Sequence, residues 1–462
     1  MAGAMQFRSH KNFHCLPTVC RWGSLVALVA VFGCERSAPS RTGSTTPSPS
    51  PPIEVQVLRP HPAPDGPPTP EQTALKHKLE LQLAAENPTH RLTLSNHRVV
   101  EGQIVNETAT TIMLREEYGY SGSIISAYRR ADIAAIDGLR SNTCEVTRQD
   151  LALFEQFPNF HFAKVPPYSI VSDAPYADVE RTVKLLTQLR EQFERHFAVL
   201  IRPNHALQNI QVVFFSAEEP FRSYARKVAP PFVSSAGFYS ASENRLVLLN
   251  QLGTAQFLNV QDRLTQQRRA LDSRPDIDPN DRHLASTRLA TVKSEMTYAA
   301  KAMTERLVRH EGAHQLVAAY GIQSRYGVEP TWLSEGLAQY CEPSEIGAYH
   351  RALAERLIKA RDDHRLLALS TVLNHRDAAG FFTLGEPNIE TAYAESWGMT
   401  YFLMQDRHRT KFLNYIKSLR DINSDAAAIT AYKADPETLL LRALGTDSNT
   451  LETQWQQFLT RL

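Results

Sequence analysis

The chain has 462 residues, which is more than one hydrophobic core normally serves, so two or more folded units are expected. Its 50 Lys and Arg residues against 49 Asp and Glu residues give a formal net charge of +1. This balance gives no sign of the basic surface that nucleic-acid binding requires, and we expect no nucleic-acid partner.

Residues 1–34 have the pattern of an export signal. Basic residues precede an apolar run from Trp22 to Phe32, which is too short to span a membrane and is typical of a signal peptide. The run ends in the sequence VFGC at residues 31–34, which resembles the lipobox of bacterial lipoproteins. The resemblance implies that Cys34 is lipid-modified and that the mature protein is anchored to a membrane of the bacterial cell envelope, facing the periplasm or the exterior. An ordinary or membrane-retained signal peptide is the alternative.

Residues 35–70 are rich in Ser, Thr and Pro, so a disordered linker is predicted there. Within the next segment, 71–140, a helix is expected at 71–86. Five short alternating stretches follow between residues 91 and 138, with Gly102 at a bend. They resemble a small SH3-like or Sm-like β-barrel. Since no basic stripe with interleaved aromatic residues is present, we expect the barrel to have a structural or protein-docking role.

Residues 145–252 have the pattern of a mixed α/β unit that ends in a hairpin. The stretches 234–239 and 244–249 are predicted to be two strands around a short turn.

Residues 253–345 are predicted to contain an insertion followed by two helices. A polar stretch near 251–283 indicates either a mobile helical insertion near a cleft or an inert surface excursion. Apolar residues then recur at steps of three and four from Leu289 to Val317, which predicts a helix with one face toward a core. A turn at Tyr320-Gly321 ends this helix, and the segment from Thr331 to Cys341 is predicted to form the next one.

The first of these two helices contains the motif HEGAH at residues 310–314. Because residues four apart lie on the same face of a helix, His310 and His314 can both point their imidazoles at one ion. Catalytic zinc usually has three protein ligands and a water. Glu335, in the second helix, is the best candidate for the third ligand, and Glu311 is close enough to contact a metal-bound water. Chance occurrence of the motif is the alternative.

The sequences HEGAH at 310–314 and WLSEGLAQY at 332–340 together resemble the gluzincin metallopeptidases, the thermolysin-like and aminopeptidase-like group. The resemblance implies one zinc ion per chain, held by His310, His314 and Glu335, with Glu311 as catalytic base. The wider pattern from about 167 to 403 resembles a bacterial domain family of unknown function allied to these peptidases. The implied fold is α+β, with a mixed sheet, active-site helices and a helical C-terminal part.

Residues 346–462 are predicted to be mostly helical. The resemblance offers Tyr393 as a donor to the oxyanion of the reaction, although a tyrosine packed in a core is the alternative. Outside the leader, Cys144 and Cys341 could pair in an oxidising compartment, and a buried structural thiol is the favoured role of Cys341. The histidines that stand alone, His350 among them, are expected to be surface or core residues.

These observations predict a zinc-dependent metallopeptidase that hydrolyses peptide bonds in the bacterial cell envelope, with peptides or proteins as substrates and a lipid anchor in the membrane. The alternative is a non-catalytic envelope lipoprotein that uses a metallopeptidase-like fold to bind proteins. Glu311 favours the enzyme, because a purely structural metal site has no need of a base beside it.

Overall fold

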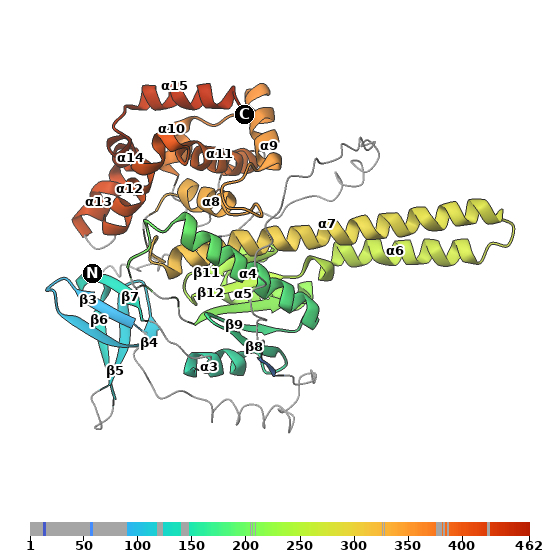
Figure 1. Ribbon diagram of the computed structural model, residues 1–462, viewed down its shortest axis with the longest axis horizontal. Coiled ribbons are helices and arrows are strands. Elements are labelled where there is room, and N and C mark those ends of the chain that lie inside the picture. Colours follow the sequence, from blue (N-terminus) through green and yellow to red (C-terminus); the bar gives the residue numbers. More distant parts are fainter. Residues whose placement is uncertain are drawn as a thin grey trace, which may run out of the picture.

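The structure is a computed structural model of the chain. It describes residues 13–14, 56–58, 90–117, 123–139, 147–375 without 204, 206, 208, 326 and 328, and 381, 384–385, 388–422 and 426–462. Two sheets and many helices make up this part, so the fold is mixed α+β (Figure 1). Cys34, Cys144 and the helix predicted at 71–86 lie outside the described residues, as does nearly all of the predicted signal peptide and linker.

A five-stranded antiparallel sheet forms where five short strands were predicted. Its strands are β3 (His90–Leu94), β4 (Val99–Glu107), β5 (Thr111–Glu117), β6 (Ser123–Arg129) and β7 (Ile133–Gly138), in the order β6-β5-β4-β3-β7. A Cβ at Gly102 would collide with the carbonyl oxygen of Arg115 on the next strand, so only glycine allows the two strands this approach. The five strands are confirmed, while the finer assignment to an SH3-like or Sm-like barrel stays a prediction.

A seven-stranded mixed sheet forms the centre of the molecule. Its strands, in spatial order, are β1 (Phe13–His14), β11 (Gly237–Ser240), β12 (Arg245–Leu249), β10 (Ile210–Phe215), β9 (Tyr168–Ser172), β8 (His161–Val165) and β2 (Gln56–Leu58). Strands β12, β10 and β9 are parallel, and the other pairs are antiparallel. The predicted hairpin is confirmed as β11 and β12. Strands β1 and β2 come from the predicted leader and linker.

Helices cover both faces of this sheet. Successive side chains of a strand point to opposite faces, and β10 follows this rule: Val212 and Phe214 belong to one hydrophobic core, Val213 and Phe215 to another. Helices α4 (Tyr176–His196) and α7 (Pro279–Ala319) pack on the first face, and α3 (Arg148–Gln156) and α5 (Glu218–Val228) on the second. The result is three layers, with α7 running across the sheet (Figure 1).

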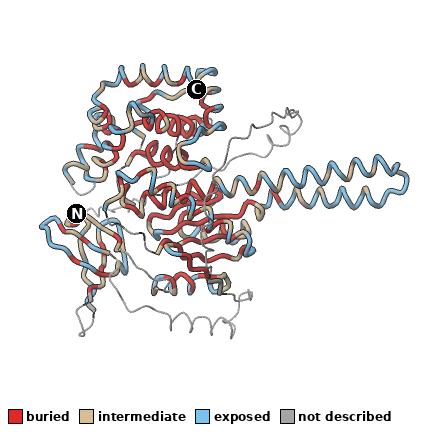
Figure 2. The backbone as a smooth tube through the Cα atoms, in the orientation of Figure 1, coloured by how far each residue is buried: buried red, intermediate tan, exposed pale blue. Residues whose placement is uncertain are grey.

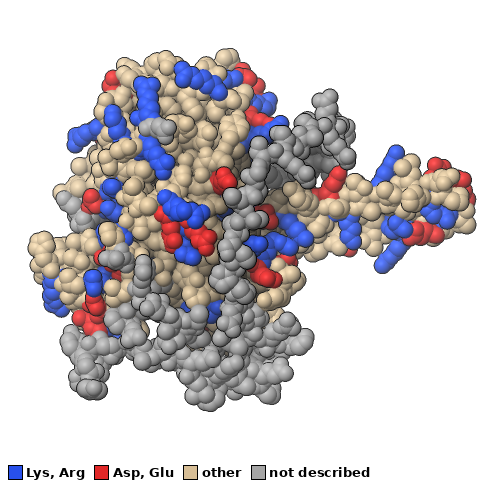
Figure 3. Space-filling view, in the orientation of Figure 1, with Lys and Arg blue, Asp and Glu red and all other residues tan. Residues whose placement is uncertain are grey.

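Helix α6 (Ala255–Asp272) and the first half of α7 form a long helical arm that projects from the body (Figure 1). The arm is largely exposed (Figure 2), and acidic and basic side chains are interspersed along it (Figure 3). Leu289 is only half-buried and Val292 is exposed, whereas Leu307 is buried. The prediction of a core-facing stripe was therefore wrong for the first half of α7, which packs on α6 alone, and correct from about Ala300 onward.

The C-terminal part is helical, as predicted. After α8 (Thr331–Tyr340), it contains α9 (Arg351–Asp362), α10 (Leu369–Asn374), α11 (Asn388–Leu403), α12 (Asp406–Ile422), α13 (Ala426–Ala434), α14 (Pro436–Leu444) and α15 (Ser448–Leu459). Helix α11 is buried along nearly its whole length and packs against α8. Within the described ranges, no helix combines the length and the apolar character needed to cross a membrane.

Candidate metal centre

Three side chains from α7 and α8 meet in the buried interior. The Nε2 atoms of His310 and His314 lie 3.2 Å apart, and Glu335 Oε2 lies 3.3 Å from the first and 3.8 Å from the second. In a tetrahedral zinc site with ligand atoms about 2.0–2.1 Å from the ion, two ligand atoms lie roughly 3.3 Å apart. The spacing of the three atoms therefore suits a metal ion bound between them.

Local sequence explains how the two helices bring these side chains together. Helix α7 ends at Ala319, and Gly321 has a φ of 62°, a left-handed conformation that glycine adopts readily and that turns the chain toward α8. Gly312, half a turn from the histidines, faces α4, where a Cβ would lie 2.9 Å from Leu189 Cδ2. Close packing against α4 therefore explains this glycine.

One oxygen of Glu335 supports the presence of a metal in the native protein. Among the residues that the structure describes, Glu335 Oε2 is buried and has no hydrogen-bond partner. A buried polar atom without a partner costs about 1–3 kcal/mol, and a bound cation would remove that cost. Two imidazole nitrogens and a carboxylate oxygen are also a donor set that zinc accepts, so the residues present fit the ion.

The charges of the three side chains are strongly coupled. Burial raises the pKa of Glu335, but the neighbouring histidines outweigh it and lower this pKa to about 2. Burial likewise lowers the pKa of His310, and the nearby carboxylates of Glu335 and Glu342 raise it to about 10. A metal ion at this place must therefore compete with a proton for His310.

A second carboxylate, which the sequence analysis missed, orients His310. Glu342 Oε1 lies 2.8 Å from His310 Nδ1, and Glu342 Oε2 lies 2.8 Å from His350 Nε2. Because the backbone N–H of Leu353 donates to His350 Nδ1, the proton of a neutral His350 is on Nε2, which donates to Glu342. Since the carboxylate accepts from His310 Nδ1, His310 Nε2 remains for a metal.

The sequence held no clear signal for Glu342. That residue lies just beyond the end of α8 at Tyr340, so the helical spacing that links His310 and His314 does not apply to it. His350 was expected to be a surface or core residue, and it is largely buried. His350 is not one of the candidate metal ligands, but it contacts Glu342, which orients the candidate ligand His310.

Glu311, the predicted base, lies between the metal-binding helix and the sheet. It is fully buried, and its Oε2 accepts a 3.1 Å hydrogen bond from the backbone N–H of Tyr239 in β11. Strand β11 also pairs with β1, in a register that sets His14 opposite Tyr239. The Glu311 carboxylate is thus held by β11, a strand that also pairs with the extended segment β1.

Tyr393 is buried in α11, the helix that packs against α8. Its ring makes an edge contact with Phe381 at a centroid distance of 5.2 Å. Its catalytic role stays a prediction. Cys341 is a free thiol in the described structure, and burial raises its pKa to about 12, as suits a structural residue.

One protein-family model matches this chain. The family is described as "Protein of unknown function (DUF1570)", and the match covers residues 305–423, from the second half of α7 to the loop after α12. No curated protein matches the chain. The matched region contains all three candidate ligands and is compatible with the expected family of unknown function. The description of the family names no activity.

Proposed function

We propose that this chain is a zinc-dependent metallopeptidase of the gluzincin type. One observation carries the proposal. The imidazole nitrogens of His310 and His314 lie close to a buried oxygen of Glu335 that lacks a hydrogen-bond partner among the described residues. A purely structural metal site would have no use for the carboxylate of Glu311, which accepts a hydrogen bond from strand β11.

In this proposal His310, His314 and Glu335 hold the ion. A bound zinc ion supplies Lewis acidity, which lowers the pKa of a water molecule to about 7 and polarises a carbonyl group. Glu311 accepts a proton from the attacking water and passes it to the leaving amine. The bond from the Tyr239 N–H keeps the Glu311 carboxylate aimed while the proton is transferred. Tyr393 would donate to the developing oxyanion.

The test is to purify the mature protein, count its zinc and compare it with Glu311→Gln. We expect about one zinc per chain in both proteins and a loss of peptide hydrolysis of roughly 100-fold or more in the variant. Glu305→Gln is the matched control, because Glu305 is an exposed carboxylate on the same helix. Full activity in Glu311→Gln would contradict the proposed mechanism.

The rival function is protein binding without catalysis. To separate the two, a proteome-derived peptide mixture is incubated with the wild-type protein and with Glu311→Gln, and new peptide termini are identified by mass spectrometry. Termini that arise only with the wild-type protein support the peptidase. A zinc-loaded, folded protein that generates none supports the binding protein.

A further inference from the structure

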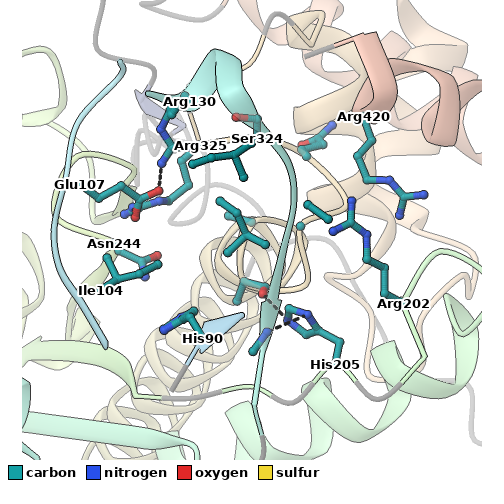
Figure 4. A pocket seen from close by; sticks show the side chains of 18 of the residues that line it. His90, Ile104, Glu107, Arg130, Arg202, His205, Asn244, Ser324, Arg325 and Arg420 are labelled. Carbon is teal, nitrogen blue, oxygen red and sulfur yellow. Dashed lines mark hydrogen bonds and ion pairs between the residues drawn. The ribbon is translucent and has the colours of Figure 1, made fainter. Parts of the chain in front are cut away.

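A second candidate site lies between the five-stranded sheet and the end of α7. It is a cavity of about 520 Å³, in the range of small-molecule sites. Strands β4 and β7 line one side of it, and the C-terminal end of α7 with the following loop lines another. Helix α12 contributes Arg420 (Figure 4). Several segments that are far apart in sequence therefore meet around this cavity, among them the segment after α4 that carries Arg202.

The cavity is rich in positive charge. Among its described lining residues, five are arginines and one is a carboxylate. That carboxylate, Glu107, is shared by Arg130 and Arg325 (Figure 4). Arg129 pairs with Asp132 on its own side of the sheet. At this end of the cavity, two arginines share one carboxylate, and the third arginine has a carboxylate partner of its own.

At the other end of the cavity, two arginines have only long ion pairs. Arg202 and Arg420 lie next to each other (Figure 4), and the pKa of Arg420 is lowered by burial and then by the charge of Arg202. Arg202 has a long ion pair of 3.4 Å with Asp137. Arg420 Nε lies 3.7 Å from Asp421, whose side chain is 73% exposed. Two like charges held together in this way favour an anion that contacts both.

Two buried donors belong to residues that line this cavity. In the part of the chain that the structure describes, neither Gln323 Nε2 nor Arg420 Nε has a hydrogen-bond partner. Gln323 is only 6% exposed, and both residues line the cavity. Since buried donors without acceptors are unfavourable, a ligand with several acceptor oxygens would be stabilised here.

We propose that this cavity binds a small molecule with a phosphate group, through the guanidinium groups of Arg202 and Arg420 and the amide of Gln323. Phosphate provides the double charge that two neighbouring arginines require and accepts bidentate hydrogen bonds from each of them. The bound molecule would join the five-stranded sheet and α12 to the end of the metal-binding helix. This proposal does not depend on the peptidase function.

The experiment titrates inorganic phosphate and glycerol 3-phosphate into the purified full chain by calorimetry, with chloride at equal ionic strength as the reference. Saturable binding of either compound, with a rise in melting temperature that chloride does not produce, is the expected result. The compound that binds more tightly distinguishes free phosphate from an organic phosphate ester. Absence of binding by both compounds would overturn the proposal.

Variants place the binding in this cavity. Arg420→Gln should weaken it about tenfold or more, because a charge-assisted hydrogen bond is lost. Arg407→Gln, an exposed arginine on the same helix, should leave it unchanged. Gln323→Met should also weaken phosphate binding, while keeping or raising the stability of the ligand-free protein, since it removes a buried donor. Equal binding by wild type, Arg420→Gln and Gln323→Met would contradict the assignment.

Discussion

The carboxylate of Glu342 decides which nitrogen of His310 is available to a metal. Its two oxygens accept from His310 Nδ1 and from His350 Nε2, so one side chain orients the ligand and is itself oriented. Such partners of ligating histidines fix the tautomer and the ring orientation. Glu342 is thus a positioning residue, since it does not meet the metal or a substrate.

We expect Glu342→Gln to weaken zinc binding by about 10- to 100-fold without unfolding the protein. An amide can accept from only one of the two histidines, so the other one loses its orientation. The measurement is a competition titration against a chelating dye. Glu345→Gln serves as the control, because Glu345 is exposed on the same loop and makes no contact with His310 in the described structure. Unchanged affinity in Glu342→Gln would show that His310 is oriented in another way.

At the scale of elements, the approach of α8 to α11 sets the position of the third ligand. A Cβ at Gly336 would collide with the carbonyl oxygen of Ser396 and the hydroxyl of Thr400, both on α11. Backbone atoms cannot move aside as a side-chain tip can. Glu335 precedes this glycine, so the close approach of the helices also holds the ligand.

Gly336→Ala should therefore destabilise the protein by about 1–3 kcal/mol through overpacking, although alanine favours a helix. Urea unfolding measures this change. We also expect weaker zinc binding, because α8 must shift away from α11. A variant as stable as the wild type would mean that the two helices are not in close contact in solution.

Helix α11 also contains a buried carboxyl group, Glu395. Burial raises its pKa to about 8, against the effect of the hydrogen bond from the Leu367 N–H. Between about pH 4.5 and 8 the folded protein keeps a proton that the unfolded chain releases. The contribution of Glu395 to the free energy of unfolding must then fall as pH rises through this window, by at most about 1.4 kcal/mol per pH unit.

Glu395→Gln should remove this dependence, because an amide does not titrate yet still accepts from Leu367. Urea unfolding at several values between pH 5 and 8 gives the slope for each protein. Glu390→Gln, an exposed site on the same helix, should keep the slope of the wild type. If the slopes of wild type and Glu395→Gln agree, Glu395 is already ionised in the folded state.

At the scale of the whole molecule, the proposed lipid anchor determines where the metal centre acts. Cys34 lies outside the described residues, and its role stays a prediction from the sequence. Each buried methylene of an acyl chain contributes about 0.8 kcal/mol to membrane binding, so loss of the modified cysteine should release the protein.

We expect Cys34→Ser to move the mature protein from the membrane fraction to the soluble fraction. Cys20→Ser, within the same predicted leader, should leave it in the membrane. Fractionation followed by immunoblotting separates the two outcomes. Membrane retention of Cys34→Ser would favour an uncleaved signal peptide as the anchor.

The sequence by itself determined the features that depend on near neighbours. Spacings of a few residues were enough for these features, since helix and strand geometry repeat locally. They are the shared face of His310 and His314, the hairpin at β11 and β12, the five short strands and the end of α7. A glutamate in the next helix could be proposed as a third ligand for the same reason.

Only the tertiary structure decided which distant groups meet. Helix packing brought Glu335 to the two histidines, tied Glu311 to β11 and placed His350 behind Glu342. It also gathered arginines from the small sheet, the α7 loop and α12 around one cavity. The arm of α6 and α7 shows the same limit, because an amphipathic pattern indicates that one face is covered but not whether a core or a single helix covers it. Contacts between segments depend on how whole elements pack, and no local spacing encodes that arrangement.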